Sequence, residues 1–306
     1  MDKEFINGDF LSPIQLLNNQ KYDGHKSLHD EEMADSLGFS GAPIEGCTHL
    51  SQFVPLLEEI FKDEWFVSGC ISVHYKNMVF EGERVKAFAR LPGESKITDI
   101  WMEKEDGTIV LTGSAGIGPN HQTSSLDNLM SKLDKTENLV ILSEINEGLE
   151  GNERFTVKIG FDQHMGDLYP FTLRNKLSVI TEPMTWYNEA EGNSSPWGRP
   201  IIPIEMISVL TNYVGNPSNF IVKGPVIGLF ANQEIKLFKG PLFVNEEYQI
   251  EKKIIAVSQS KRVETYWCMT YVYDQNKILV AECLLNQAFL KDSYKGYEEE
   301  LKNISG

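Results

Sequence analysis

Three ionisable side chains, Asp23, His25 and His29, lie close together in one short polar segment near the start of the chain. An imidazole titrates near neutral pH, so a histidine beside a carboxylate can serve as a general acid or base. His25 lies two residues after Asp23 and points the same way in an extended loop, whereas His29 reaches that side only where the loop bends. The spacing indicates acid–base chemistry. The alternative is that Asp23 and Asp30 cap turns and that the histidines lie on the surface.

Two predicted elements must position this segment. A short helical turn over 31–37 and a Gly/Pro turn over 38–46 lead into a strongly apolar helix. Apolar residues of that helix recur at spacings of three and four, which predicts one buried stripe. They are Leu50, Phe53, Val54, Leu57, Ile60 and Phe61. Because a helix start offers unpaired N–H groups and a positive dipole end, the loop is aimed at a place where a carbonyl can be polarised.

Glu45 and His49 flank the predicted start of this helix. Glu45 is a candidate general base, but a carboxylate there is also simply favourable to the helix dipole. His49 is a candidate hydrogen-bond donor to a ligand, and the alternative is a core or surface histidine. Metal chemistry finds less support, because His164 with Asp162 and Asp167 is too small a set for a metal site.

Composition limits the classes of function. A chain of 306 residues predicts about two domains, each able to enclose a core. The net charge of −16 argues against binding to nucleic acid and disfavours attraction to anionic membranes. Four cysteines without CxxC spacing indicate reduced core thiols in a cytosolic protein, with a single disulfide as the alternative. Neither a signal peptide nor an apolar run approaching 18 residues is apparent, so we expect a cytoplasmic protein with no membrane span.

Alternating apolar residues predict antiparallel strands in both halves of the chain. In the first half they cover 68–77, 84–91, 97–104 and 108–117, with a hairpin at 105–107. A polar stretch from Pro119 to about Leu139 follows and is predicted to hold one helix over 126–133. We therefore divide the chain into an N-terminal unit (1–120), a linker (121–150) and a C-terminal unit (151–306).

The second half repeats the pattern of the first. Its segment 200–205 (PIIPIE) resembles 43–45 (PIE), and each precedes an apolar helix, predicted over 204–214 in the second case. Residues 235–246 match 73–83, with Phe243 on Phe80 and Glu246 on Glu83, and strands over 248–255, 262–273 and 277–289 follow. Such a repeat indicates two related units.

The two copies differ where the His-rich loop lies. Residues 182–187 take the place of Asp23 to Leu28, and histidines give way to aromatic residues. This asymmetry suggests that one copy does chemistry while the other shapes the pocket. Trp186, Tyr187 and Trp197 are candidates for lining that pocket, with core or interface packing as the alternative.

These features together resemble the MaoC-like double hot-dog proteins. The likeness rests on Gly38-Phe39, Pro43-Ile44-Glu45-Gly46 and Val79-Phe80-Glu81-Gly82-Glu83 in the first half, and on Ser195-Pro196-Trp197-Gly198 in the second. It implies an α+β, tandem (double) hot-dog fold, each unit an antiparallel sheet wrapped around one long helix. The family's loop motif is Asp-x-Asn-Pro-x-His; here Asp23 matches its Asp, whereas His25 and Leu28 stand at its Asn and His positions.

The resemblance implies a hydratase or dehydratase, a carbon–oxygen lyase acting on an enoyl-CoA or 3-hydroxyacyl-CoA type of thioester. Asp23 with His25 or His29 would then be catalytic, and Gly46 matches the glycine whose N–H contacts the thioester carbonyl. Coenzyme A would be part of the substrate, with no metal or other cofactor, and a homodimer is plausible. The alternatives are a thioesterase, a specialised dehydratase or cyclase acting on a polyketide-like metabolite, and a non-catalytic protein that binds an acyl chain or hydrophobic ligand.

Overall fold

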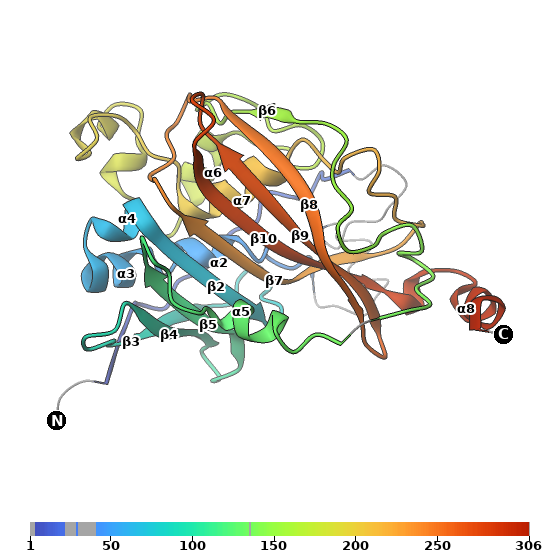
Figure 1. The fold of residues 1–306 in the computed structure, drawn as a ribbon. Helices are drawn as coiled ribbons and strands as arrows, with labels where there is room; N and C mark the ends of the chain where they lie inside the picture. Colours follow the sequence, from blue (N-terminus) through green and yellow to red (C-terminus); the bar gives the residue numbers. More distant parts are fainter. Residues whose placement is uncertain (1–3, 22–28, 30–40, 135, 306) are drawn as a thin grey trace.

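One large antiparallel sheet organises the molecule (Figure 1). A computed structural model describes residues 4–21, 29, 41–134 and 136–305. Within these residues the sheet has ten strands, in the order β1-β3-β4-β5-β2-β7-β10-β9-β8-β6. The strands are β1 (Phe5–Asn7), β2 (Gly69–Tyr75), β3 (Val85–Arg90), β4 (Ile97–Lys104), β5 (Ile109–Ile117), β6 (Phe155–Val157), β7 (Gly228–Leu237), β8 (Tyr248–Gln259), β9 (Val263–Tyr273) and β10 (Leu279–Leu290).

The strand order is mirrored about the pair β2–β7. Counted outward from this pair, the first half is β2-β5-β4-β3-β1 and the second half is β7-β10-β9-β8-β6. In the pair itself, Ile71 lies opposite Ile235 and His74 lies opposite Asn232. Because a ladder of backbone hydrogen bonds joins β2 to β7, the two halves share one continuous sheet.

The strand predictions agree with this sheet. The fourth strand covers 97–104 as predicted, and β4 pairs with β5 through a turn in which Gly107 has a φ of +82°. The strands predicted over 262–273 and 277–289 also form a hairpin, since β9 pairs with β10 around 274–278. The short outer strands β1 and β6 were not predicted, because three residues carry too little alternation to be recognised. Strand β7 was not predicted either; only its end, from residue 235, had been matched to 73–83.

The predicted long helix of the first half is wrong in one respect: it is two short helices, α2 (Thr48–Ser51) and α3 (Val54–Phe61), followed by α4 (Glu64–Ser68). Pro55 explains the break, because it has no N–H to donate to the carbonyl of Ser51 and its ring crowds that carbonyl. The buried stripe is nevertheless confirmed, since Leu50, Phe53 and Leu57 are fully buried.

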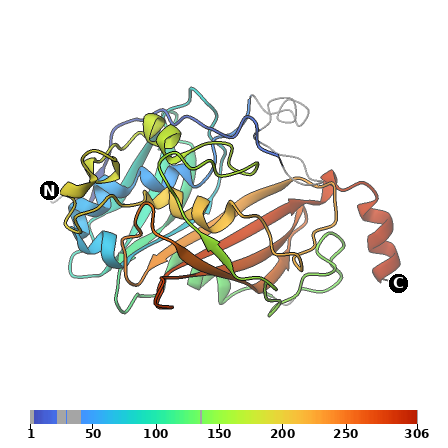
Figure 2. The same cartoon turned by 90° about the horizontal axis from the view of Figure 1, so that it is seen from above.

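Two helices of the second half lie on the same side of the sheet as α2 (Figure 2). Helix α7 (Ile204–Asn212) is almost entirely buried, as its apolar sequence predicts, and it contacts both α2 and β7. Helix α6 (Leu173–Val179) was not predicted. It begins with a capping box, in which Thr172 accepts a hydrogen bond from the N–H of Asn175 and the Asn175 side chain accepts one from the N–H of Thr172.

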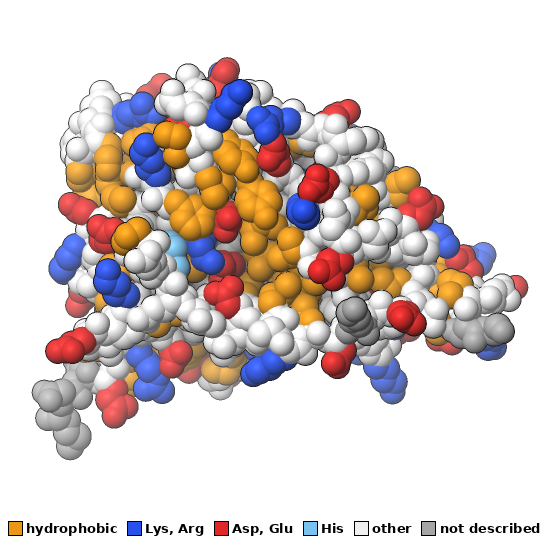
Figure 3. Space-filling view, in the orientation of Figure 1, with side chains coloured by type: hydrophobic (Ala, Val, Ile, Leu, Met, Phe, Trp, Pro, Cys, Tyr) orange, Lys and Arg blue, Asp and Glu red, His pale blue; other side chains and the backbone are white. Residues whose placement is uncertain are grey.

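The linker helix α5 (Ser125–Met130) covers the opposite face of the sheet. Ser72 points to this face, because its neighbours Ile71 and Val73 belong to the main core, and its hydroxyl accepts a hydrogen bond from the N–H of Leu126. Leu126 packs in a small apolar cluster with Trp267 of β9 and Leu284 of β10. Hydrophobic side chains gather over the centre of this face in Figure 3.

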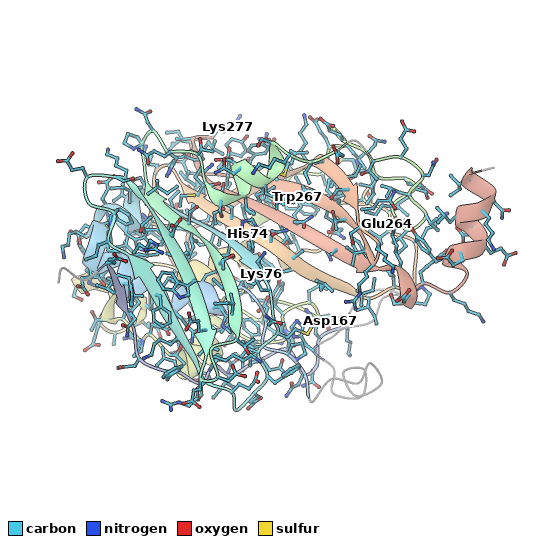
Figure 4. The ribbon with its side chains drawn as sticks, turned by 90° about the horizontal axis from the view of Figure 1, so that it is seen from below. His74, Lys76, Asp167, Glu264, Trp267 and Lys277 are labelled. Carbon is cyan, nitrogen blue, oxygen red and sulfur yellow. The ribbon has the colours of Figure 1, made fainter. Side chains whose placement is uncertain are left out.

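A buried carboxylate holds two chain segments that are far apart in the sequence. Glu264, at the start of β9, accepts hydrogen bonds from the N–H groups of Val140 and Leu142 and from the hydroxyl of Tyr297 (Figure 4). Val140 and Leu142 lie within the predicted linker (121–150), and Tyr297 begins α8 (Tyr297–Ser305). One side chain therefore ties both segments to the second half of the sheet.

The four cysteines are free and buried, as predicted for reduced core thiols. None of the helices in the described ranges is both long and apolar enough to cross a membrane.

Candidate functional site

A cavity of about 220 Å³ lies beside the start of α2. Residues of the first half line one side of it, from the segments 43–46 and 75–79 together with His29 and His49. The second half supplies the segment 228–231 of β7, with Gln287 of β10. These β7 residues lie beyond the last pair with β2, His74 opposite Asn232, so the sheet itself carries them to the cavity. Both halves therefore form its walls.

His29 is the member of the predicted His-rich segment that the structure places in this cavity. Its Nδ1 lies 2.8 Å from the carbonyl oxygen of Pro43. A carbonyl can only accept, so Nδ1 carries the proton and Nε2 is the basic nitrogen of the neutral ring. Burial lowers the pKa of His29, although the bond to Pro43 opposes this. The ring is thus suited to accept a proton.

Glu45 lies in the same cavity wall and is buried. Burial raises the pKa of its carboxyl, while Lys176 and hydrogen bonds from Cys47 and Tyr169 act against that rise. Among the described residues, no hydrogen-bond partner faces its Oε2 atom. A carboxyl with a raised pKa and one unpaired oxygen is suited to hold a proton and to donate it.

Behind Glu45, two further buried charges join three helices. The Nζ of Lys176 on α6 lies 3.2 Å from Oε2 of Glu205 on α7 and donates to Oγ1 of Thr48 on α2, also at 3.2 Å. Glu205 belongs to the second copy of the PIE sequence, yet neither Glu205 nor Lys176 was predicted as a site residue. The repeated PIE was the available signal for Glu205.

Gly46 is in close contact with an aromatic ring. A Cβ atom added at this position would lie 2.8 Å from Cζ of Tyr75. Tyr75 is held in place because its hydroxyl donates to Oε1 of Gln233 at 3.1 Å. Glycine is required here because the Tyr75 ring packs directly against the backbone, and both residues line the cavity.

His49 is buried and also lines the cavity. Its Nδ1 lies 3.1 Å from Oε1 of Gln52, and burial lowers its pKa to about 4. The ring is neutral around pH 7 as a result. The structure thus brings together four of the predicted residues, which are His29, Glu45, Gly46 and His49.

Backbone hydrogen bonds show which residue of the second half is equivalent to Gly46. The N–H of Ile202 donates to the carbonyl of Leu242 at 2.8 Å, as that of Ile44 donates to Val79 at 2.7 Å. Likewise Ile201 bridges to Phe243 as Pro43 bridges to Phe80, which agrees with the predicted match of these phenylalanines. By this correspondence Ile204 stands where Gly46 stands in the first half.

The void in the second half is only about 20 Å³. Its walls include Ile204 and Tyr187, and Leu237 lies there at the position that Tyr75 holds in the first repeat. The walls of this small void are apolar side chains, and an isoleucine stands at the position of Gly46. A cavity of useful size exists at one of these two equivalent places.

Trp186, Tyr187 and Trp197 do not line the 220 Å³ cavity, contrary to the prediction. The two tryptophan rings meet edge to face at 5.6 Å and both contact Phe66 of α4. A short 3-10 helix, η1 (Thr185–Tyr187), is tied to the chain by the bond from Ile201 N–H to the Trp186 carbonyl, which directs these rings toward α4. Both tryptophans are half-buried and pack against the main core, whereas Tyr187 is buried and lines the small void. This packing is the alternative considered for them.

Asp23 and His25, with the predicted helical turn over 31–37, lie outside the described residues. Among those that are described, no group of three His, Cys, Asp or Glu side chains is placed to hold a metal ion. Sequence reasoning missed Tyr75, Gln233 and Gln287, whose strand positions carry no local mark of a site.

Comparisons with known proteins agree with this architecture. The sequence matches no protein-family model and no curated protein. Among solved structures it is similar to one provisionally named a MaoC domain protein dehydratase, from Chloroflexus aurantiacus J-10-fl, with 12% identity, coverage of 86% of this chain and 87% of the other, and a TM-score of 0.55. This chain has a MaoC-like hot-dog fold.

A second solved structure supports the same fold. It is named a MaoC-like dehydratase, is 11% identical, and has a TM-score of 0.53 over 92% of this chain and 97% of the other. The resemblance predicted from the sequence is thereby confirmed for the fold. At such low identity, the MaoC-like likeness by itself assigns no reaction.

Proposed function

We propose that this protein is a hydro-lyase that adds water to, or removes it from, an acyl thioester of the enoyl-CoA or 3-hydroxyacyl-CoA type. The observation that carries the proposal is the pairing in one cavity of a neutral imidazole, His29, with a carboxyl of raised pKa, Glu45. Hydration needs one group that accepts a proton and one that supplies it. The fold shared with MaoC-like dehydratases is consistent with this chemistry.

In the direction of hydration, Nε2 of His29 takes a proton from water as the water oxygen forms a bond to the β-carbon. The electron pair of the carbon–carbon double bond moves toward the thioester carbonyl, whose oxygen gains negative charge. The N–H of Gly46 is proposed to stabilise this oxygen. Glu45 then delivers its proton to the α-carbon, and proton transfer from His29 to Glu45 through solvent restores the starting state.

The substrate is proposed to include coenzyme A, with no metal or other cofactor. Lys76 lines the cavity, is exposed, and follows the last residue of β2 (Figure 4). We propose that its ammonium binds an anionic group of the substrate, as a phosphate of coenzyme A would require. By the resemblance, Asp23 is proposed to assist His29 from the preceding loop.

We also propose that the fold is a tandem hot-dog, with units at 1–120 and 151–306 joined by the linker 121–150. The mirrored strand order about β2–β7 and the matching bonds of Ile44 and Ile202 support two equivalent units. In this proposal the first unit supplies the reacting groups and the second supplies a wall.

The test is an assay of purified protein with a panel of enoyl-CoA esters of increasing chain length, following loss of the conjugated thioester. The variants H29Q and E45Q are expected to lose turnover, and H164Q is the matched control, since His164 is an exposed loop residue. Equal rates in H29Q and wild type would contradict the proposal. A tightly retained lipid in the mass spectrum, with no turnover of any ester, would instead favour the ligand-binding alternative.

A further inference from the structure

A line of hydrogen bonds leads from the cavity into the second half of the chain. It starts at His49, whose Nδ1 lies 3.1 Å from Oε1 of Gln52. The Gln52 amide donates through Nε2 to Oγ1 of Thr181 at 3.3 Å. Thr181 in turn donates to Oε1 of Glu182 at 2.6 Å. Residues 129 positions apart in the sequence are thus joined side chain to side chain.

Every donor in this line points toward Glu182. A hydroxyl has a single proton, and Thr181 uses it for the carboxyl oxygen, so its own oxygen must accept from the Gln52 amide. That fixes the Gln52 carbonyl oxygen on the side of His49. An amide oxygen can only accept, so His49 must carry its proton on Nδ1. Nε2 is then the basic nitrogen of this cavity-lining ring.

Three of the four side chains in the line, those of His49, Gln52 and Glu182, are buried, and Thr181 is half-buried. Water therefore competes little for the three buried groups. Burial raises the pKa of Glu182 to about 8, and the charge of Glu205 adds to this. An ionised Glu182 can only accept at the oxygen that Thr181 contacts. A neutral Glu182 accepts there when its proton lies on Oε2, which has no hydrogen-bond partner among the described residues. The line has the same orientation in both of these forms.

We propose that Glu182 is a positioning residue that acts through Thr181 and Gln52 to hold His49 with Nδ1 protonated and Nε2 as an acceptor in the cavity. Resting on the proposed function, this acceptor selects a substrate that presents a hydrogen-bond donor, either the hydroxyl of a 3-hydroxyacyl thioester or the attacking water. The second half then determines the chemistry of a ring that belongs to the first.

The test is nitrogen NMR of protein labelled with [15N]histidine, with the His49 signals assigned from their absence in H49N. In wild type we expect a single neutral tautomer with the proton on Nδ1. T181V and E182L are expected to produce a mixture of tautomers or the opposite one. T181S keeps the hydroxyl and E182Q keeps an acceptor oxygen, so both variants should show the wild-type signals. T185V is the matched control, since Thr185 is an exposed threonine of the same segment.

Two results would overturn the proposal: a wild-type ring protonated on Nε2, or unchanged His49 signals in both T181V and E182L. Using two disrupting variants keeps the test decisive if one of them does not fold. On an ester that wild type converts, we expect T181V to lower kcat/KM by about tenfold, because one hydrogen bond of the line is lost. If no ester is turned over by wild type but the tautomer still depends on Thr181, the proposed reaction fails and the positioning role stands.

Discussion

The ammonium of Lys176 lies 3.2 Å from the carboxylate oxygen Oε2 of Glu205, and both side chains are fully buried. Glu45 contributes a second carboxyl to the same neighbourhood, since Lys176 acts on its pKa as well. One buried cation is therefore shared by two carboxyl groups, one from each PIE sequence. Burial raises the pKa of Glu45, and within this arrangement Lys176 lowers that pKa while Glu205 raises it.

Replacing Lys176 with Met should destabilise the fold by about 3–5 kcal/mol, because it leaves buried carboxyl groups without their cation. Urea unfolding of wild type and K176M measures the difference. K239M is the control, since Lys239 is exposed and its removal should change stability by less than about 0.5 kcal/mol. A K176M protein as stable as wild type would contradict the role of the shared cation.

The variant H29Q is expected to lower kcat by about 10²–10⁴-fold on the best ester of the panel, because the general base is lost. KM should change little, as glutamine keeps a hydrogen-bonding group of similar size. Steady-state kinetics over a range of substrate concentrations separates the two constants. A loss confined to KM would assign His29 to binding and not to proton transfer.

Gly46→Ala should be harmful although it adds one methyl group. The new Cβ meets the Tyr75 ring at 2.8 Å, and the hydroxyl of Tyr75 is bound to Gln233, so the ring cannot move freely. We expect a loss of about 1–3 kcal/mol in unfolding free energy and a strong fall in turnover. Gly8→Ala is the control, because a Cβ there meets nothing within 4 Å. Equal unfolding free energies for Gly46→Ala and Gly8→Ala would contradict the close packing at Gly46.

Replacing Lys76 with Met tests how the thioester is carried. If the ammonium meets a phosphate of coenzyme A, K76M should raise KM for enoyl-CoA esters about tenfold, the loss of roughly 1.4 kcal/mol. The same acyl group on N-acetylcysteamine, which has no phosphate, should show no change between K76M and wild type. An equal rise in KM for both substrates would remove the phosphate contact from the proposal.

Glu182 should make stability depend on pH. Its pKa is about 8 in the folded chain and near 4.5 when exposed, so its contribution is complete below 4.5 and is lost as pH rises through about 8. Relative to E182Q, wild type should lose at most about 4 kcal/mol of unfolding free energy over that range. Urea unfolding of both proteins at about pH 5 and about pH 9 measures it. A constant difference between the two would contradict the raised pKa.

Local sequence patterns were sufficient to predict most of the sheet. Strands such as β4 alternate clearly between buried and more exposed residues, and turns such as Glu105-Asp106-Gly107 mark where they end. Helix α7 was predicted because its apolar residues continue through two turns. The proline at 55 was available to predict the break between α2 and α3, but the apolar stripe continues across it and hid the boundary.

The site was harder to predict because its parts meet only through the fold. His29, Glu45 and His49 lie near one another in the sequence, which made them recognisable. Lys176 lies in a helix of seven residues and gives no sign that it will be buried against Glu205. The aromatic residues Trp186 and Trp197 are half-buried and pack against the main core, and aromatic side chains in a sequence do not distinguish core packing from a ligand wall.

The join between β2 and β7 limits how the chain can be divided. A fragment ending in the linker would keep the segment 43–46 but expose the unpaired edge of β2, which invites aggregation. It would also lack residues 228–231, leaving the cavity open to solvent on one side. Directed evolution of the acyl preference should therefore mutate residues 228–231 of β7 within the intact chain. These residues form a cavity wall, so they determine which acyl groups fit.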